Sequence, residues 1–229
     1  MADNFKERFS QAVKETETVV YSYLPEETGH QKTIFEAMNY SVKAGGKRLR
    51  PLLMREVYRL FGGNGPEIEP FMAAMEMIHT SSLIHDDLPC MDNDEYRRGK
   101  LTTWKAYGYD MAVLAGDALM IYAFATASKA FSMGADPAKV GRAIGILAEK
   151  TGIYGMIGGQ TGDVELTGKA VPREKLDFIY RLKTGALLEA SMMIGAVLAG
   201  ATMEEVKEVE AKASEVGVGF QIQDHFLHV

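Results

Sequence analysis

The chain has 229 residues, 47% of them hydrophobic, so it can bury a substantial core as one large domain or two small ones. Its formal net charge of −6 argues against a nucleic-acid-binding protein, and an anionic ligand must therefore be held by local basic clusters. The single cysteine, Cys90, excludes an internal disulfide and is typical of a reducing compartment. We expect one domain over residues 1–229.

Two further features of the sequence favour a soluble, cytoplasmic protein. The first ten residues lack the apolar core that a signal peptide needs. The most apolar stretch, residues 186–201, is shorter than the ~18 residues of a membrane span and contains Glu189. We therefore expect no membrane span.

Helical periodicity dominates the chain and strand alternation is nearly absent, which predicts an all-α fold. In chain order, helices are predicted over residues 5–24, 31–43, 51–61, 68–85, 110–131, 137–151, 173–199 and 202–229. Glycines inside them each cost about 1 kcal/mol relative to alanine, so we expect close helix or ligand approach there. These glycines are Gly116, Gly141, Gly145, Gly195, Gly217 and Gly219. We predict a single helical bundle with its active cavity between the helices.

The segment 83–99, LIHDDLPCMDNDEYRRG, carries the strongest chemical signal. Asp86, Asp87 and Asp92 lie within seven residues and would repel one another unless a divalent cation held them. Mg²⁺ prefers such oxygen ligands and shares its coordination sphere with substrate phosphates. Most acidic runs are solvated loops, but apolar residues interrupt this one. We predict a magnesium–diphosphate site, with Arg97 and Arg98 clamping the phosphates.

Two details of the predicted helix 68–85 support this site. His79 lies two turns before Asp86 and shares its face. A lone histidine on an apolar helix is more often a core residue, but here we favour a phosphate contact. Pro89 moves Leu88 away from helical geometry, which should help Asp92 to fold back beside Asp86.

The segment 44–51, AGGKRLRP, predicts a second anion pocket. Its two glycines let backbone amides approach an anion, and three cations follow at the start of a helix. An ordinary loop is the alternative, and the pairing with Arg97-Arg98 favours the diphosphate pocket. Later segments, GGQTGD (158–163), KTG (183–185) and GFQIQD (219–224), are weak alone. Lys183 by itself would be taken as a surface lysine and Gln160 as a helix cap.

Taken together, these segments resemble the trans-isoprenyl diphosphate synthases of the bacterial farnesyl or geranylgeranyl type. The resemblance covers about residues 35–224, with six motifs in order: GGKRLRP, IHTSSLIHDDLPCMDNDEYRRG, LAGDAL, GGQTGDVE, KTGALLEAS and GFQIQD. It implies an all-α bundle, usually a homodimer, in which Mg²⁺ bridges a diphosphate to two Asp-rich motifs. It also implies further helices beyond residue 229.

The resemblance implies a role for each matching residue. Isopentenyl diphosphate would be held by Gly46, Lys47, Arg50, His79 and Arg98. The metal ligands would be Asp86, Asp87, Asp92 and, in the last motif, Asp224. The allylic diphosphate would be contacted by Arg97, Lys183, Thr184 and Gln221, and Gln160 would also bind substrate. Lys183 is counted among the catalytic residues together with the three aspartates of the first motif, Asp86, Asp87 and Asp92. Ser81 and Ser82, five and four residues before Asp86, would set the product length.

The implied chemistry is ionisation of the allylic C–O bond, attack by the isopentenyl double bond and loss of a proton, with water excluded. The sequence departs from the family at the last motif, where the second and third acids are His225 and His228. A truncated or non-catalytic diphosphate-binding relative, or a partner subunit of a prenyl synthase, is therefore the alternative function. A terpene cyclase would share the fold but would not need the isopentenyl pocket at Gly46, Lys47 and Arg50.

Overall fold

The computed structural model of this chain describes residues 2–169 and 172–227, with side chains described for 4–169, 172–217 and 219. The all-α prediction is confirmed, because nearly all of the regular secondary structure in the described residues is helical. The α-helices are α1 (Ala2–Ser22), α2 (Lys32–Val42), α3 (Leu49–Leu60), α4 (Glu69–Asp86), α5 (Thr103–Tyr107), α6 (Tyr109–Ala127), α7 (Pro137–Thr151), α8 (Met156–Leu166), α9 (Arg173–Tyr180), α10 (Ala186–Ala199) and α11 (Met203–Leu227). Two 3₁₀ turns, η1 (Pro66–Ile68) and η2 (Ser128–Met133), and one π-helical turn, η3 (Arg181–Gly185), lie between them.

Four features differ from the sequence-based prediction, and the first is the short helix α5, which was not predicted. Helix α8 was not predicted, because Gly158, Gly159 and Gly162 lower its intrinsic helix propensity. The helix predicted over residues 173–199 is α9, the π turn η3 and α10. A small antiparallel hairpin also forms between β1 (Tyr96–Arg97) and β2 (Lys100–Leu101).

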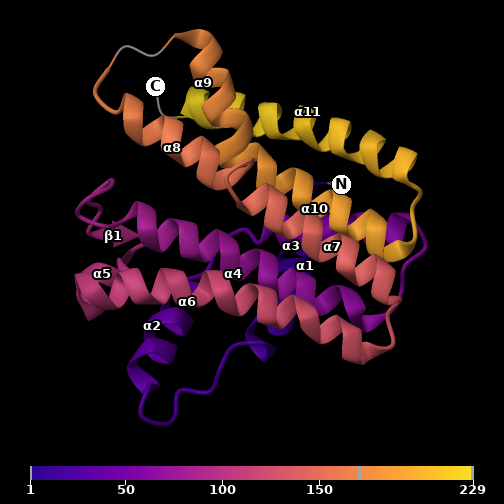
Figure 1. The fold of residues 1–229 in the computed structure, drawn as a ribbon, viewed down its shortest axis with the longest axis horizontal. Coiled ribbons are helices and arrows are strands. Elements are labelled where there is room, and N and C mark those ends of the chain that lie inside the picture. Colours follow the sequence, from indigo (N-terminus) through magenta and orange to yellow (C-terminus); the bar gives the residue numbers. More distant parts are fainter. Residues whose placement is uncertain (1, 170–171, 228–229) are drawn as a thin grey trace. The chain divides into compact units, whose positions relative to one another are not determined.

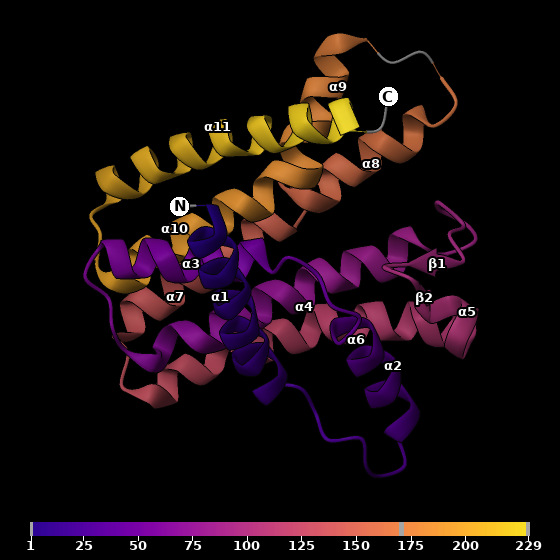
Figure 2. The same cartoon turned by 180° about the vertical axis from the view of Figure 1, so that it is seen from behind.

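The chain folds into two compact units, and the single domain expected over residues 1–229 stays a prediction. The first unit comprises residues up to 52 and 69–129, and the second comprises residues 53–68 and those from 130 on. Figures 1 and 2 show the helices and strands from opposite sides, coloured along the chain.

In the first unit, α4 is the core helix. It packs along α6 and also contacts α1 and α2 (Figure 1). Twelve of its 18 residues are buried, so its polar side chains need partners inside the protein. Gly116 of α6 permits close packing here, since a Cβ at that position would lie 2.1 Å from Nε2 of His85. The close approach predicted at Gly116 is therefore confirmed.

In the second unit, α10 is the core helix and packs against α7 and α11. A Cβ on Gly195 would lie 2.4 Å from the carbonyl oxygen of Met54 in α3, so the prediction of close approach is confirmed there as well. At Gly141, Gly145 and Gly219 an added Cβ would meet nothing within 4 Å among the described residues, so no helix lies close there and approach of a ligand stays a prediction.

Two helical stretches of the described chain, Tyr109–Met133 and Arg173–Ala199, are long and apolar enough to cross a membrane by length and composition. Core helices of soluble proteins pass the same test. The most apolar windows of these stretches are 39% and 72% buried within the protein, so they are weak evidence for a span.

Candidate functional site

The first acidic motif begins at the last residue of α4 and then folds back on itself. The N–H of Asp92 donates to the carbonyl oxygen of Asp86 over 2.9 Å, and the N–H of Asn93 donates to that of Leu88 over 3.1 Å. Asn93 adopts a left-handed conformation, with φ of 55°, which asparagine tolerates better than most residues. The predicted return of Asp92 to Asp86 is confirmed at the level of the backbone.

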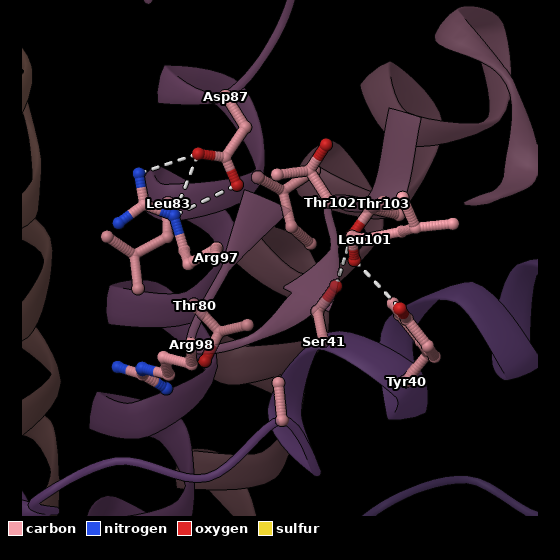
Figure 3. A pocket seen from close by; sticks show the side chains of 12 residues that line it. Tyr40, Ser41, Thr80, Leu83, Asp87, Arg97, Arg98, Leu101, Thr102 and Thr103 are labelled. Atoms are coloured by element: carbon pink, nitrogen blue, oxygen red, sulfur yellow. Dashed lines mark hydrogen bonds and ion pairs between the residues drawn. The ribbon is translucent and has the colours of Figure 1, made fainter. Parts of the chain in front are cut away.

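Asp87 is held by an arginine of the hairpin. Its side chain is buried, and Nε of Arg97 donates to both of its carboxylate oxygens, over 2.7 and 3.0 Å. Nη2 of Arg97 lies 2.6 Å from Oδ1, which makes a charge-assisted fork (Figure 3). Burial raises the pKa of Asp87, and Arg97 opposes this rise. The carboxylate of Asp87 is thus engaged by Arg97, while Asp86 is half-buried and Asp92 is exposed.

Asp86 and Asp92 carry the kind of oxygen ligand that a magnesium ion prefers. Within the described parts of the chain, no group of three or more histidine, cysteine or acidic side chains could hold a metal by themselves. Mg²⁺ does not need such a cage, because it is commonly bound by one or two carboxylates together with water and substrate phosphates. Asp86 and Asp92, brought together by the folded-back loop, are hard oxygen donors of this kind. The side chain of Asp224, the fourth predicted ligand, lies outside the described side chains.

The segment 44–50 meets the hairpin through Arg98. Gly45 and Gly46 have φ values of 90° and 139°. The guanidinium of Arg98 lies 2.9 Å from where a Cβ of Gly46 would stand, and its Nη1 donates to the carbonyl oxygen of Gly45. The positive φ favours glycine at position 46, and Arg98, 52 positions away in sequence, lies in the space that a Cβ there would fill. The two basic segments, which the sequence analysis paired, are brought together in this unit.

His79 lies against Arg50. Nη1 of Arg50 is 3.2 Å from Nε2 of His79, and since a guanidinium only donates, Nε2 must accept. Burial, together with the charges of Arg50 and Arg98, holds the pKa of His79 well below 6.5. His79 is therefore neutral near pH 7 and orients Arg50, while Lys47 of the same basic segment is exposed. Direct contact of His79 with a phosphate stays a prediction.

Three residues that the sequence analysis missed hold the hairpin in place. The hydroxyl of Tyr40 donates to the carbonyl oxygen of Leu101 over 2.7 Å (Figure 3). The hydroxyl of Thr102 and Nε1 of Trp104 both donate to the carbonyl oxygen of Asp94, each over 2.8 Å. The only sequence signal was local: Arg98-Gly99 occupies the hairpin turn with φ values of 54° and 75°, as a type I′ turn requires.

The two serines expected to set product length have different surroundings. The hydroxyl of Ser81 is fully buried, donates to the carbonyl oxygen of Ile78 over 2.8 Å and lies 4.0 Å from Sδ of Met120 in α6. Ser82 is half-buried, and its hydroxyl donates to the carbonyl oxygen of His79 over 2.8 Å. A larger side chain at position 81 must therefore displace Met120.

The second unit holds the remaining predicted residues. Lys183 lies in the π turn η3, and its Nζ is 2.7 Å from Oδ2 of Asp163 in α8. A Cβ on Gly159 would lie 2.3 Å from the backbone nitrogen of Lys183, so glycine is needed where α8 meets η3. Gln160 and Thr184 are half-buried on these elements. Gln221 and Asp224 belong to α11, in its part whose side chains are outside the described set.

Comparison with known protein families and sequences gives a consistent result. Residues 31–229 match the model of the family described as polyprenyl synthetase. The chain is 48% identical to a geranylgeranyl pyrophosphate synthase of Capsicum annuum, over 86% of this chain and 53% of that protein. It is 41% identical to a farnesyl diphosphate synthase of Geobacillus stearothermophilus, over 100% of this chain and 77% of that protein. The chain thus spans about half the length of the plant relative.

Solved structures give the same picture. An apo FPP/GFPP synthase from Zymomonas mobilis superposes with a TM-score of 0.91 at 36% identity, covering 100% of this chain and 82% of that one. A geranyltransferase from Legionella pneumophila superposes with a TM-score of 0.90 at 32% identity, covering 98% and 79%.

Proposed function

The chain belongs to the polyprenyl synthetase family, and on that premise we propose that it is a Mg²⁺-dependent prenyltransferase. It condenses isopentenyl diphosphate with an allylic diphosphate, which is dimethylallyl, geranyl or farnesyl diphosphate. The product is farnesyl or geranylgeranyl diphosphate.

One observation carries this proposal. The first unit brings two basic segments, 45–50 and 97–98, against the end of the helix that supplies Asp86. Arg50 lies on His79 of α4, Arg98 lies on Gly45, and Arg97 holds Asp87 beside Asp86. Cations gathered from separate parts of the chain beside hard oxygen ligands suit two diphosphate groups and a metal ion.

The residues of this chain divide the chemistry between them. Magnesium, when bound by Asp86 and Asp92, would draw negative charge onto the allylic diphosphate and so favour its departure. Arg97 would hold the allylic diphosphate, while Lys47, Arg50 and Arg98 hold the isopentenyl diphosphate; the contact of Lys183 with the allylic diphosphate, which the family resemblance implies, stays a prediction. The isopentenyl double bond then attacks the allylic cation, and a proton is lost to the departed diphosphate. The buried apolar surface of α4 helps to exclude water, which would quench the cation.

We propose geranylgeranyl diphosphate as the main product, with farnesyl diphosphate as the alternative. The small side chains of Ser81 and Ser82 support a deep tail cavity. The names of the relatives support both products, since a geranylgeranyl and a farnesyl synthase are among them.

We also propose a homodimer in the cytoplasm. Helix α6 supports the dimer, because it leaves Leu114 and Ile121 55% and 71% exposed. Exposed side chains of this size on one helix are typical of an interaction surface. The single cysteine supports a reducing compartment.

A second candidate is a catalytically weak partner subunit. A relative from Arabidopsis thaliana, 47% identical over 86% of this chain and 54% of its own length, is named as the large subunit of a heterodimeric geranylgeranyl pyrophosphate synthase. The two histidines of the last motif favour the same alternative, since imidazole is a poor ligand for Mg²⁺.

The test separates the two candidates. The purified protein is incubated with Mg²⁺, isopentenyl diphosphate and geranyl diphosphate, and products are identified by mass spectrometry after dephosphorylation. A twenty-carbon or fifteen-carbon alcohol that disappears when the metal is chelated supports the enzyme. Binding of isopentenyl diphosphate by calorimetry without any product would overturn it in favour of the partner subunit.

A further inference from the structure

Arg48 is a cation of the basic segment that the proposed function does not use. Its side chain is fully buried, whereas its neighbour Lys47 is exposed. Nη1 of Arg48 donates to Oε1 of Glu76 over 2.6 Å, and Nε donates to Oε1 of Glu17 over 3.2 Å. Nη2 donates to the carbonyl oxygen of Val42 over 2.7 Å and to the hydroxyl of Tyr21 over 3.1 Å. Arg48 therefore joins α1, the end of α2, and α4.

The backbone of Arg48 is held in a conformation that it would not adopt by itself. Its φ is 49°, in the left-handed region that a residue with a Cβ rarely enters. Its carbonyl oxygen accepts a hydrogen bond of 3.1 Å from the N–H of Leu52 in the first turn of α3. The side chain of Arg48 is thus hydrogen-bonded to Val42 at the end of α2, and its main chain to Leu52 in α3. These two bonds fix the ends of the segment that connects α2 and α3.

The contacts of Arg48 and Arg50 fall on neighbouring turns of one helix. Glu76 receives Arg48, and His79, three residues further along α4, receives Arg50. Residues three apart are neighbours on the same helix face. Glu76 has 3% of its side chain exposed, so its charge needs Arg48. Burial lowers the pKa of Arg50, and the Glu76 carboxylate opposes that shift.

We propose that Arg48 and Glu76 are positioning residues for the isopentenyl diphosphate pocket: their buried ion pair holds the segment 45–50 in the one conformation that presents Lys47 and Arg50 to the diphosphate. This inference rests on the proposed function for the identity of the ligand, and on the contacts of the unliganded protein for the positioning. A preformed segment avoids the ordering cost that binding would otherwise include.

If Arg48 and Glu76 contributed only to stability, a variant of both residues that stays folded would bind isopentenyl diphosphate as the wild type does. Replacing a buried ion pair by apolar residues of similar volume is often neutral for stability, whereas breaking it by removing one partner is strongly destabilising. The double variant Arg48→Met/Glu76→Met should therefore fold, because the other carboxylate on Arg48, that of Glu17, is 25% exposed and can be solvated. The variant nevertheless lacks the contacts that orient the segment. The matched control is Lys150→Met/Glu189→Met, which replaces a buried ion pair of the second unit that shares no element with residues 45–50.

The first measurement needs no substrate. Hydrogen exchange of the amides of Ala44 and Leu52, which donate to the carbonyl oxygens of Ser41 and Arg48, is followed by mass spectrometry of peptides that cover residues 44–52, in the wild type, the double variant and the control. We expect exchange in this segment to rise at least about tenfold in the double variant, with α6 unchanged, because the left-handed conformation loses its support. The control should exchange like the wild type in this segment. Unchanged exchange in the double variant would overturn the proposal, whatever the protein binds.

The second measurement tests the consequence for binding. Calorimetry and steady-state kinetics should give a Kd and a KM for isopentenyl diphosphate raised about tenfold or more in the double variant, with kcat changed less than threefold and the KM for geranyl diphosphate unchanged. Arg48→Lys, which keeps the charge on Glu76 but loses the fork, should recover part of this affinity. If the wild type binds isopentenyl diphosphate and the double variant binds it equally well, the proposal is wrong. If the wild type binds none, the proposed function fails, and hydrogen exchange alone decides the positioning role.

Discussion

The backbone N–H of Asp92 donates to the carbonyl oxygen of Asp86 over 2.9 Å, so the residues between them form a closed loop at the end of α4. Two carboxylates that are six positions apart in sequence thereby start from adjacent points of the backbone. A straight helix would place them on different faces, because six residues do not complete two turns.

Among the residues of this loop, Asp86 is the one on which ionisation of the allylic C–O bond should depend most. We expect Asp86→Ala to lower kcat by about 10³-fold or more, because the metal that stabilises the leaving diphosphate loses a ligand. The Kd for isopentenyl diphosphate should change by less than about threefold. Rate assays and calorimetry check both numbers. Glu95→Ala, at an exposed acid that follows the loop and pairs with Lys105, is the control, and a variant at Asp86 that retains most of its rate would refute the assignment.

Arg98→Ala should show the opposite pattern. The guanidinium of Arg98 lies over Gly46 and bonds to Gly45, so its loss removes a charge-assisted contact to isopentenyl diphosphate. We expect affinity for this substrate to fall by about 1.5–3 kcal/mol, with kcat at saturation changed much less. Titration calorimetry measures the loss. Lys100→Ala, on the other strand of the hairpin, should bind like the wild type, and equal losses in both variants would indicate a general charge effect.

Ser81→Tyr should shorten the product. The serine is fully buried and 4.0 Å from Sδ of Met120, so a tyrosine ring must fill the space next to α6 or displace that methionine. We expect the fifteen-carbon product to increase at the expense of the twenty-carbon product in chromatography of the dephosphorylated alcohols. Ser82→Tyr, at the neighbouring half-buried serine, is the comparison. An unchanged product ratio in the variant at position 81 would place the floor of the cavity elsewhere.

The neutral state of His79 predicts a loss of stability at acid pH. Burial and the nearby cations hold its pKa well below 6.5, whereas in the unfolded chain it titrates near 6.5. As pH falls below about 6.5 the unfolded state therefore binds a proton that the folded state does not. The free energy of unfolding then decreases, by at most about 1.4 kcal/mol per pH unit from this group.

Urea denaturation at several values between about pH 5 and pH 7.5 measures this effect. His79→Gln should have a shallower pH dependence than the wild type below pH ~6.5. His30→Gln, at an exposed histidine, should keep the steeper dependence of the wild type. If the wild type and His79→Gln lose stability in parallel, His79 is not the group responsible.

The last motif provides a test that starts from sequence. Its second and third acids are replaced by His225 and His228, and imidazole is a poor ligand for Mg²⁺. We expect His225→Asp/His228→Asp to raise kcat in Mg²⁺ by about tenfold or more. This prediction is checked by measuring kcat of the wild type and of the double variant in Mg²⁺ at saturating substrate. If kcat of the wild type already equals that of the variant, Asp86, Asp92 and Asp224 are enough for Mg²⁺-dependent activity without the two further acids.

Much of the fold could be predicted from the sequence because helices follow from local pattern. The apolar periodicity of residues 68–85 and the glycines after residue 61 were enough to place α4 and the end of α3 near their observed limits. The return of Asp92 to Asp86 also follows from local chemistry, since Pro89 disfavours a helical conformation at the residue before it. The family resemblance rested on motifs of the same local kind.

Tertiary structure alone decided which partners these residues have. Asp87, a predicted metal ligand, is bonded by Arg97 of the hairpin, and Tyr40 and Trp104 bond to the backbone of residues 101 and 94 on either side of that turn. The burial of Arg48 against Glu76 has no sequence signature either, because the two lie 28 positions apart and GGKRLRP does not indicate which cation faces inward. Helix α8 forms despite its glycines, since packing against η3 outweighs their low propensity. Local pattern selects the helices, whereas the pairing of charges depends on desolvation, which only the assembled core imposes.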